Sequence, residues 1–174
     1  MRKSRALICA AGLAAVVGMS QASAEPVRLS PVAFSAEFQS ELDDELGPRE
    51  GEYLRAALTR NLSDSFARRG ATLGENGAVS VDVVIVDADP NRPTLGQMTR
   101  RPGLDYFRSV SIGGAELHAV LRSADGGVLR EVDHRRYNHT LSEIVGPPGT
   151  WEAAQRAMRR FSEKVADAYV EQAR

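Results

Sequence analysis

The sequence has a single cysteine, Cys9, and it lies in a short apolar run near the N-terminus. That run belongs to a segment with the pattern of a secretory signal peptide, so we expect the mature chain to lack thiols. Disulfides, cysteine-ligated metals, thiol nucleophiles and thioredoxin-like redox chemistry are then excluded. The fold must be stabilised by its apolar core alone, and about 150 residues suffice for one such domain.

No apolar run is long enough to cross a membrane, because a spanning helix needs about 20 residues. The run at 6–19 follows three basic residues and precedes an Ala-Ser-Ala cleavage motif at 22–24. We therefore predict a signal peptide over 1–24, cleaved after Ala24, and a single α+β domain over 25–174. The mature protein is expected to be periplasmic or secreted, soluble and without a transmembrane segment. Lipidation of Cys9 is disfavoured, because only three apolar residues precede it.

Aromatic side chains are also few, and basic residues are fewer than acidic ones once the predicted leader is removed. Removing the leader takes away three of the 22 basic residues and none of the 23 acidic ones, which leaves a net charge of −4. A net negative domain is a poor candidate for nucleic-acid binding, which requires a basic face. Aromatic residues make up 6% of the chain, which argues weakly against a large aromatic-lined ligand cavity.

Two segments have the apolar period of amphipathic helices. In Pro48–Arg69 an apolar or aromatic residue recurs every four positions from Leu54 to Phe66, and Gly70 follows as a stop signal. The second helix is predicted over Trp151–Gln172, with Thr150 as its N-cap.

Strand patterns fill most of the remaining chain. A first strand is predicted over Val27–Phe38, with Pro31 placing it at an edge or a break. Val79–Asp87 becomes apolar on both faces and is predicted to be central in the sheet. Two further runs, 110–121 and 128–137, flank an Asp-Gly turn and predict a hairpin. Gly113 and Gly114, inside the first run, indicate a bulge or a close backbone approach.

The predicted fold class is therefore α+β. The expected order is strand, helix, three strands and helix, which gives a four-stranded, mostly antiparallel sheet. Each helix has one apolar face, so both helices are expected to pack on the same face of the sheet.

Two charged segments interrupt this pattern. The stretch 37–52 carries seven acidic side chains against Arg49 alone. We predict that it is a solvated loop or an exposed helical turn, the alternative being a site for a cation or a basic partner. The segment 89–108 is rich in proline, glycine and arginine, and long loops of this kind are often functional. One hypothesis is that it contacts an anionic or acidic partner, and the other is that its arginines are merely solvated. The candidate contact residues are Arg92, Arg100, Arg101, Tyr106, Phe107 and Arg108.

Motifs for catalysis or cofactor binding are not found. The sequence contains neither a G-x-S-x-G nor an S-x-x-K motif, and no phosphate-binding glycine loop. His134 and His139 are five residues apart, a spacing that fits no common metal motif. We therefore predict no catalytic residue, no cofactor and no metal. The less favoured hypothesis is a hydrolase or a metal-binding protein that uses Asp133, His134 and His139.

The hairpin carries one resemblance. The residues Ile112-Gly113-Gly114-Ala115-Glu116-Leu117-His118-Ala119-Val120-Leu121 and Gly127-Val128-Leu129 resemble a pattern in uncharacterised bacterial envelope proteins, many of them small lipoproteins with an α+β domain. The resemblance implies a periplasmic setting and a non-enzymatic accessory role. No functional residue is carried over, and this chain departs from the pattern in lacking the lipidated cysteine.

The function expected from the sequence is that of an exported accessory or binding protein of the cell envelope, which contacts an envelope protein or a second copy of itself. Head-to-tail self-association is possible in principle, because the acidic stretch and the arginine-rich loop have opposite charges. The alternative is a carrier of a small ligand.

Overall fold

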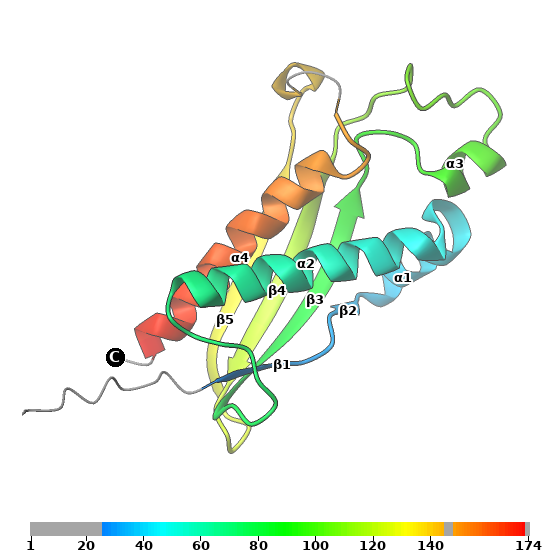
Figure 1. Ribbon diagram of the computed structural model, residues 1–174. Helices are drawn as coiled ribbons and strands as arrows, with labels where there is room; N and C mark the ends of the chain where they lie inside the picture. Colours follow the sequence, from blue (N-terminus) through cyan, green and yellow to red (C-terminus); the bar gives the residue numbers. More distant parts are fainter. Residues whose placement is uncertain (1–25, 145–147, 173–174) are drawn as a thin grey trace, which may run out of the picture.

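The computed structural model describes residues 26–144 and 148–172, and it contains a five-stranded mixed sheet with two long helices on one face (Figure 1). The sheet order is β1-β3-β4-β5, and β2 also pairs with β3. The elements are, in order, β1 (Val27–Leu29), β2 (Ala33–Phe34), α1 (Ala36–Glu41), η1 (Leu42–Leu46), α2 (Pro48–Arg68), β3 (Val79–Asp89), α3 (Leu95–Arg100), β4 (Gly114–Arg122), β5 (Val128–Tyr137), η2 (Leu141–Glu143) and α4 (Glu152–Gln172). The α+β class, the order of the main elements and the shared face of the two helices are confirmed.

The predicted first strand is divided. It breaks after Leu29 into two short strands, both parallel to β3, at the position where Pro31 predicts an edge or a break. Its expected end was wrong, because a helix begins at Ala36. The hydroxyl of Ser35 accepts from the N–H of Phe38 at 3.1 Å and caps that helix.

The acidic stretch 37–52 is helical, which agrees with the exposed helical turn that was one of its two predicted conformations. It forms most of α1, the π-helical segment η1 and the start of α2, and its apolar residues Phe38, Leu42 and Leu46 are each at most 1% exposed. Their spacing of four puts them on one face, which leaves the carboxylates on the other.

Strand β3 lies in the interior of the sheet, as expected. It pairs on one side with β1 and β2 and on the other with β4. Val81, Val83 and Ile85 are buried beneath the helices, while Asp82 lies on the helix-free face. A register shift between Ile85 and Asp87 is a bulge that changes the alternation near the end of the strand.

The hairpin pairs β4 with β5 from Gly114 opposite Tyr137 to Arg122 opposite Val128. Its first strand is shorter than predicted, since Val110 and Ile112 precede it and are exposed. The backbone N–H of Ser111 donates instead to the carbonyl of Asn91 at 3.0 Å. The predicted close approach is confirmed, because a Cβ on Gly114 would lie 2.4 Å from the carbonyl oxygen of Arg136.

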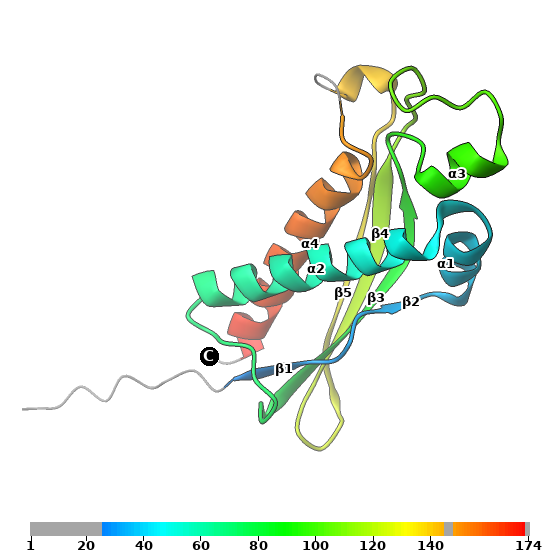
Figure 2. The ribbon, with the colours of Figure 1, turned by 45° about the vertical axis from the view of Figure 1, so that its right-hand side comes forward.

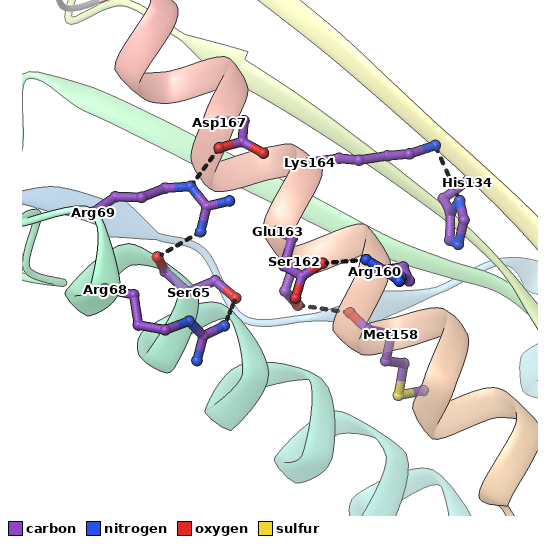
Figure 3. A network of polar contacts seen from close by, with 10 residues as sticks. All are labelled: Ser65, Arg68, Arg69, His134, Met158, Arg160, Ser162, Glu163, Lys164 and Asp167. Atoms are coloured by element: carbon purple, nitrogen blue, oxygen red, sulfur yellow. Dashed lines mark hydrogen bonds and ion pairs between the residues drawn. The ribbon is translucent and has the colours of Figure 1, made fainter.

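Helices α2 and α4 enclose the core between themselves and the sheet. The rings of Phe66 and Tyr169 meet edge to face with centroids 5.6 Å apart. At the C-terminal end of α2, Arg69 forms an ion pair of 2.6 Å with Asp167 of α4 (Figure 3). At the other end, the indole N–H of Trp151 donates to Glu50 at 2.6 Å. The two helices therefore run in the same general direction and are joined at both ends.

The predicted signal peptide, including Cys9 and the cleavage position after Ala24, lies outside the described residues. Within the described ranges, no helix combines the length and the apolar character that crossing a membrane requires.

Candidate functional site

The segment between β3 and β4 projects beyond one end of the sheet, opposite the end that carries the β4–β5 turn (Figure 2). It contains a short helix, α3, that the sequence analysis did not predict. Thr94 begins this helix with a capping box, in which its hydroxyl accepts from the N–H of Gln97 at 3.2 Å. The same hydroxyl donates to the carbonyl of Leu46 at 2.8 Å. Helix α3 is thus anchored on η1.

Arg92 is the internal anchor of this segment. Its side chain is only 6% exposed, and its Nε donates to the carbonyl of Pro148 at 2.7 Å. Its Nη1 donates to the carbonyls of Tyr106 and Phe107 at 2.6 and 3.0 Å. The guanidinium therefore joins the start of the segment to the backbone at Tyr106 and Phe107 and to the backbone at Pro148. No carboxylate of the described residues forms an ion pair with it.

Asn91 connects the segment to the last helix. Its Oδ1 accepts from the backbone N–H of Ala153 at 2.8 Å, in the first turn of α4, and its Nδ2 donates to the carbonyl of Ser111 at 3.2 Å. The expected cap, Thr150, instead donates its hydroxyl to that of Tyr106 at 3.4 Å. A Cβ on Gly113 would lie 2.6 Å from the Asn91 side chain, so this contact requires glycine.

Phe107 is the most exposed large apolar side chain of the segment, at 82%. Its backbone is nevertheless fixed: the carboxylate of Asp105 accepts from the N–H groups of Phe107 and Arg108 at 2.9 and 2.8 Å. Leu95, at 67%, is also exposed. We call seven of the exposed side chains of this segment, four of them apolar and three of them arginines, the loop surface: Leu95, Arg100, Arg101, Phe107, Arg108, Val110 and Ile112. A shallow pocket of about 370 Å³ lies beside it, between α3 and the chain that leads to β4.

The two charged segments contact one another within the molecule. Arg101 forms an ion pair of 2.5 Å with Glu45. Arg100 reaches the carbonyl oxygens of Glu45 and Asp43 at 3.3 and 3.4 Å. The acidic stretch and the arginine-rich segment are therefore neighbours that partly neutralise each other, and not two separate poles. Arg108 is exposed and has no ion pair among the described residues.

The candidate contact residues therefore separate into two groups. Arg92 is buried, and Tyr106 packs beneath the loop, where the Arg92 guanidinium lies 5.5 Å from the centroid of its ring. Arg100, Arg101, Phe107 and Arg108 are exposed. The first group fixes the conformation in which the second is presented.

Carboxylates gather where β3 ends. Burial, followed by the negative charge of Asp87, raises the pKa of Asp89 above its ordinary value. Burial, followed by the charges of Asp87 and Asp89, likewise raises the pKa of Glu41. Asp87 itself accepts a hydrogen bond from the hydroxyl of Tyr137. No group of side chains suited to hold a metal ion is found among the described residues.

Replacing Asp89 by asparagine is expected to stabilise the fold at pH 7. The pKa of Asp89 is higher in the folded than in the unfolded chain, so ionising this carboxyl disfavours folding. The destabilisation is absent below the pKa of the unfolded chain and grows as the pH rises from that pKa to the pKa of the folded chain. We expect Asp89→Asn to increase the free energy of unfolding by up to about 1 kcal/mol at pH 7 and by nothing at about pH 3. Urea unfolding at both pH values measures this, with the exposed Asp64→Asn as the control. A loss of stability at pH 7 would contradict it.

His134 and His139 do not form a shared site with Asp133. Asp133 and His134 lie on opposite faces of β5; Asp133 contacts Nδ1 of His118 on β4 at 2.7 Å, and His134 faces the helices. Nζ of Lys164 reaches Nδ1 of His134 at 3.2 Å (Figure 3). His139 follows the end of β5, where its backbone N–H donates to Glu143 at 3.1 Å. Asp133, His134 and His139 are therefore directed to different places.

No protein-family model matches this sequence, and no curated protein matches it. Solved structures show a similarity of fold. A PelC dodecamer from Paraburkholderia phytofirmans is 10% identical, with 84% of this chain and 86% of that chain covered and a TM-score of 0.46. A DUF330 protein from Xanthomonas campestris is 12% identical over 84% of this chain and 81% of that one, with a TM-score of 0.38. A minor lipoprotein from Acinetobacter baumannii is 14% identical over 86% and 92%, with a TM-score of 0.31.

The third of these structures is a lipoprotein, as are many of the proteins that the hairpin pattern resembles. At such identities the likeness concerns the fold alone, and no functional residue is carried over.

Proposed function

We propose that this protein is a non-catalytic binding protein of the bacterial cell envelope and that the loop surface contacts its protein partner. The observation that carries the proposal is Phe107, an aromatic side chain that is 82% exposed on a segment whose backbone is fixed. Large exposed apolar side chains grouped together are typical of protein–protein contacts. Aromatic residues and arginine, both present here, dominate the binding energy of such contacts.

The hydrogen bonds that fix the conformation of the segment support this role. Binding is weakened by the entropy lost when a mobile loop becomes ordered. Here the hydrogen bonds of Arg92, Asn91 and Asp105 already hold the segment in the unbound chain. A partner can therefore bind it with little further ordering.

The envelope setting rests on the signal-peptide pattern of residues 1–24. The non-catalytic role is supported by the different directions in which Asp133, His134 and His139 point. A ligand carrier has less support, since the space between sheet and helices is filled by fully buried side chains such as Phe66, Met158 and Phe161.

Cross-linking in cells tests the proposal. The tagged full-length protein is treated with a chemical cross-linker, and captured proteins are identified by mass spectrometry. We expect one dominant partner whose yield falls about tenfold in the double variant Phe107→Ala/Arg108→Glu, as the loss of an aromatic anchor and a charge predicts. The matched control is Val128→Ala/Arg130→Glu, which makes the same kinds of change on exposed residues of β5 at the far end of the sheet.

Both variants should unfold at the same urea concentration as the wild type, since all four side chains are exposed. Equal capture by the loop variant and the wild type would contradict the proposal, as would the absence of any captured protein.

A further inference from the structure

A second charged surface lies where the free edge of β5 meets α4. A pocket of about 370 Å³ is lined there by four arginines and one carboxylate, Arg136, Arg156, Arg159, Arg160 and Glu163. Arg136 is opposite Ala115, whose side chain faces the helices, so Arg136 lies on the helix side of the sheet edge. The other four are spaced along α4 at intervals that place them on one face of the helix.

The positive charge of this pocket is only partly neutralised. Arg156 pairs with Glu152 at 2.5 Å. Figure 3 shows the second contact, in which Arg160 reaches Glu163 at 3.3 Å. Arg136 and Arg159 are exposed and form no ion pair with any described residue. Two guanidinium groups therefore remain free to bind an anion.

His134 lies beside this pocket among positive charges. Burial, followed by the charges of Lys164, Arg136 and Arg160, lowers the pKa of His134, which favours the neutral imidazole. Lys164 donates to Nδ1, so the proton of the neutral ring lies on Nε2. That nitrogen is buried and has no acceptor among the described residues.

We propose that the pocket at the β5–α4 edge binds a phosphate-bearing ligand through Arg136 and Arg159. A guanidinium binds an oxyanion with two parallel N–H groups, and arginine is the preferred residue for phosphate. A phosphate group presents three oxygens and more negative charge than a single carboxylate, so it attracts two guanidinium groups to one point more strongly. A second pocket of about 470 Å³ shares Arg136 with the first and is lined also by Arg135, Tyr137, His139 and the carboxylate of Glu143.

Isothermal titration of the mature protein with pyrophosphate tests this inference, with malonate at equal ionic strength for comparison. We expect saturable pyrophosphate binding that weakens about tenfold in Arg136→Gln/Arg159→Gln, the effect of losing at least one charge-assisted hydrogen bond. The matched control, Arg49→Gln/Arg60→Gln, removes the same charge from two exposed arginines of α2 and should bind like the wild type.

Three results would overturn the proposal: no saturable binding, equal weakening in the two double variants, or malonate binding as tightly as pyrophosphate. The source of the phosphate is distinguished with vesicles of phosphatidylcholine with and without phosphatidic acid. Sedimentation with the acidic vesicles, reversed by pyrophosphate and lost in Arg136→Gln/Arg159→Gln, supports a lipid headgroup. Pyrophosphate binding without sedimentation supports a soluble phosphate compound.

Discussion

Replacing Arg92 by alanine is expected to lower the free energy of unfolding by about 3 kcal/mol. The side chain is 6% exposed and donates to the carbonyls of Pro148, Tyr106 and Phe107. Removing it leaves these acceptors without their donor and creates a cavity between segments that have no regular secondary structure. Urea unfolding followed by circular dichroism measures the loss.

Lysine is the informative second substitution at this position. Its ammonium group is compact, and it lacks the planar fork that reaches Pro148 on one side and Tyr106 and Phe107 on the other. We therefore expect Arg92→Lys to recover less than half of the loss, even though it keeps the charge. The exposed Arg108→Ala should be within about 0.5 kcal/mol of the wild type. Wild-type stability of Arg92→Lys would show that charge alone, and not the fork, fixes the loop.

The largest loss of stability is expected from Phe161→Ala, at about 4 kcal/mol. Phe161 lies on α4, is fully buried and belongs to the core that joins α4 to α2 and the sheet. The substitution loses the transfer free energy of the ring and leaves a cavity in the core. Thermal or urea unfolding of the purified mature protein measures it.

A control substitution on the same helix separates the effect of losing core packing from the effect of placing any alanine substitution in α4. Glu171→Ala changes an exposed side chain near the end of the helix and is expected to alter stability by less than about 0.5 kcal/mol. A free energy of unfolding for Phe161→Ala equal to that of Glu171→Ala would contradict the packing of α4 on the core described above.

The regular elements could be predicted because their patterns are local. Helix α2, predicted from apolar residues that recur every four positions, ends at Arg68, one residue before its predicted end. Strand β5 has the predicted bounds. Helix α3 was missed although it has a readable signal, the capping box of Thr94 and Gln97. The prolines and glycines around it favoured a loop. Its position depends on a contact with Leu46, nearly fifty residues earlier, that no local pattern encodes.

The pairing of His118 with Asp133 shows why side-chain contacts are harder to predict. Near the turn, Arg122 is opposite Val128, and counting back evenly from there would place His118 opposite Val132. A register shift between Leu121 and Arg122 moves the pairing by one residue, so that His118 faces Asp133. Such a shift moves every later side chain of one strand relative to the other, and the sequence pattern on either strand is unchanged by it.

The burial of Arg92 could not be predicted for a different reason. Arginine is rarely buried, so the sequence predicts that all four arginines of this loop are exposed. Arg92 is buried because two irregular segments that are distant in sequence, 106–107 and the one at Pro148, direct three carbonyls toward the same point. Arg100, Arg101, Phe107 and Arg108 are exposed, and the conformation that presents them depends on the one arginine of this loop that is buried.

The most direct test of a partner-binding loop surface is photo-cross-linking from position 107 in living cells. A photoreactive phenylalanine analogue replaces Phe107 in one strain and Val128, an exposed residue at the opposite end of the sheet, in another. The account predicts a single dominant cross-linked envelope protein from position 107 and none from position 128. The same product from both positions, or no product from position 107, would contradict it.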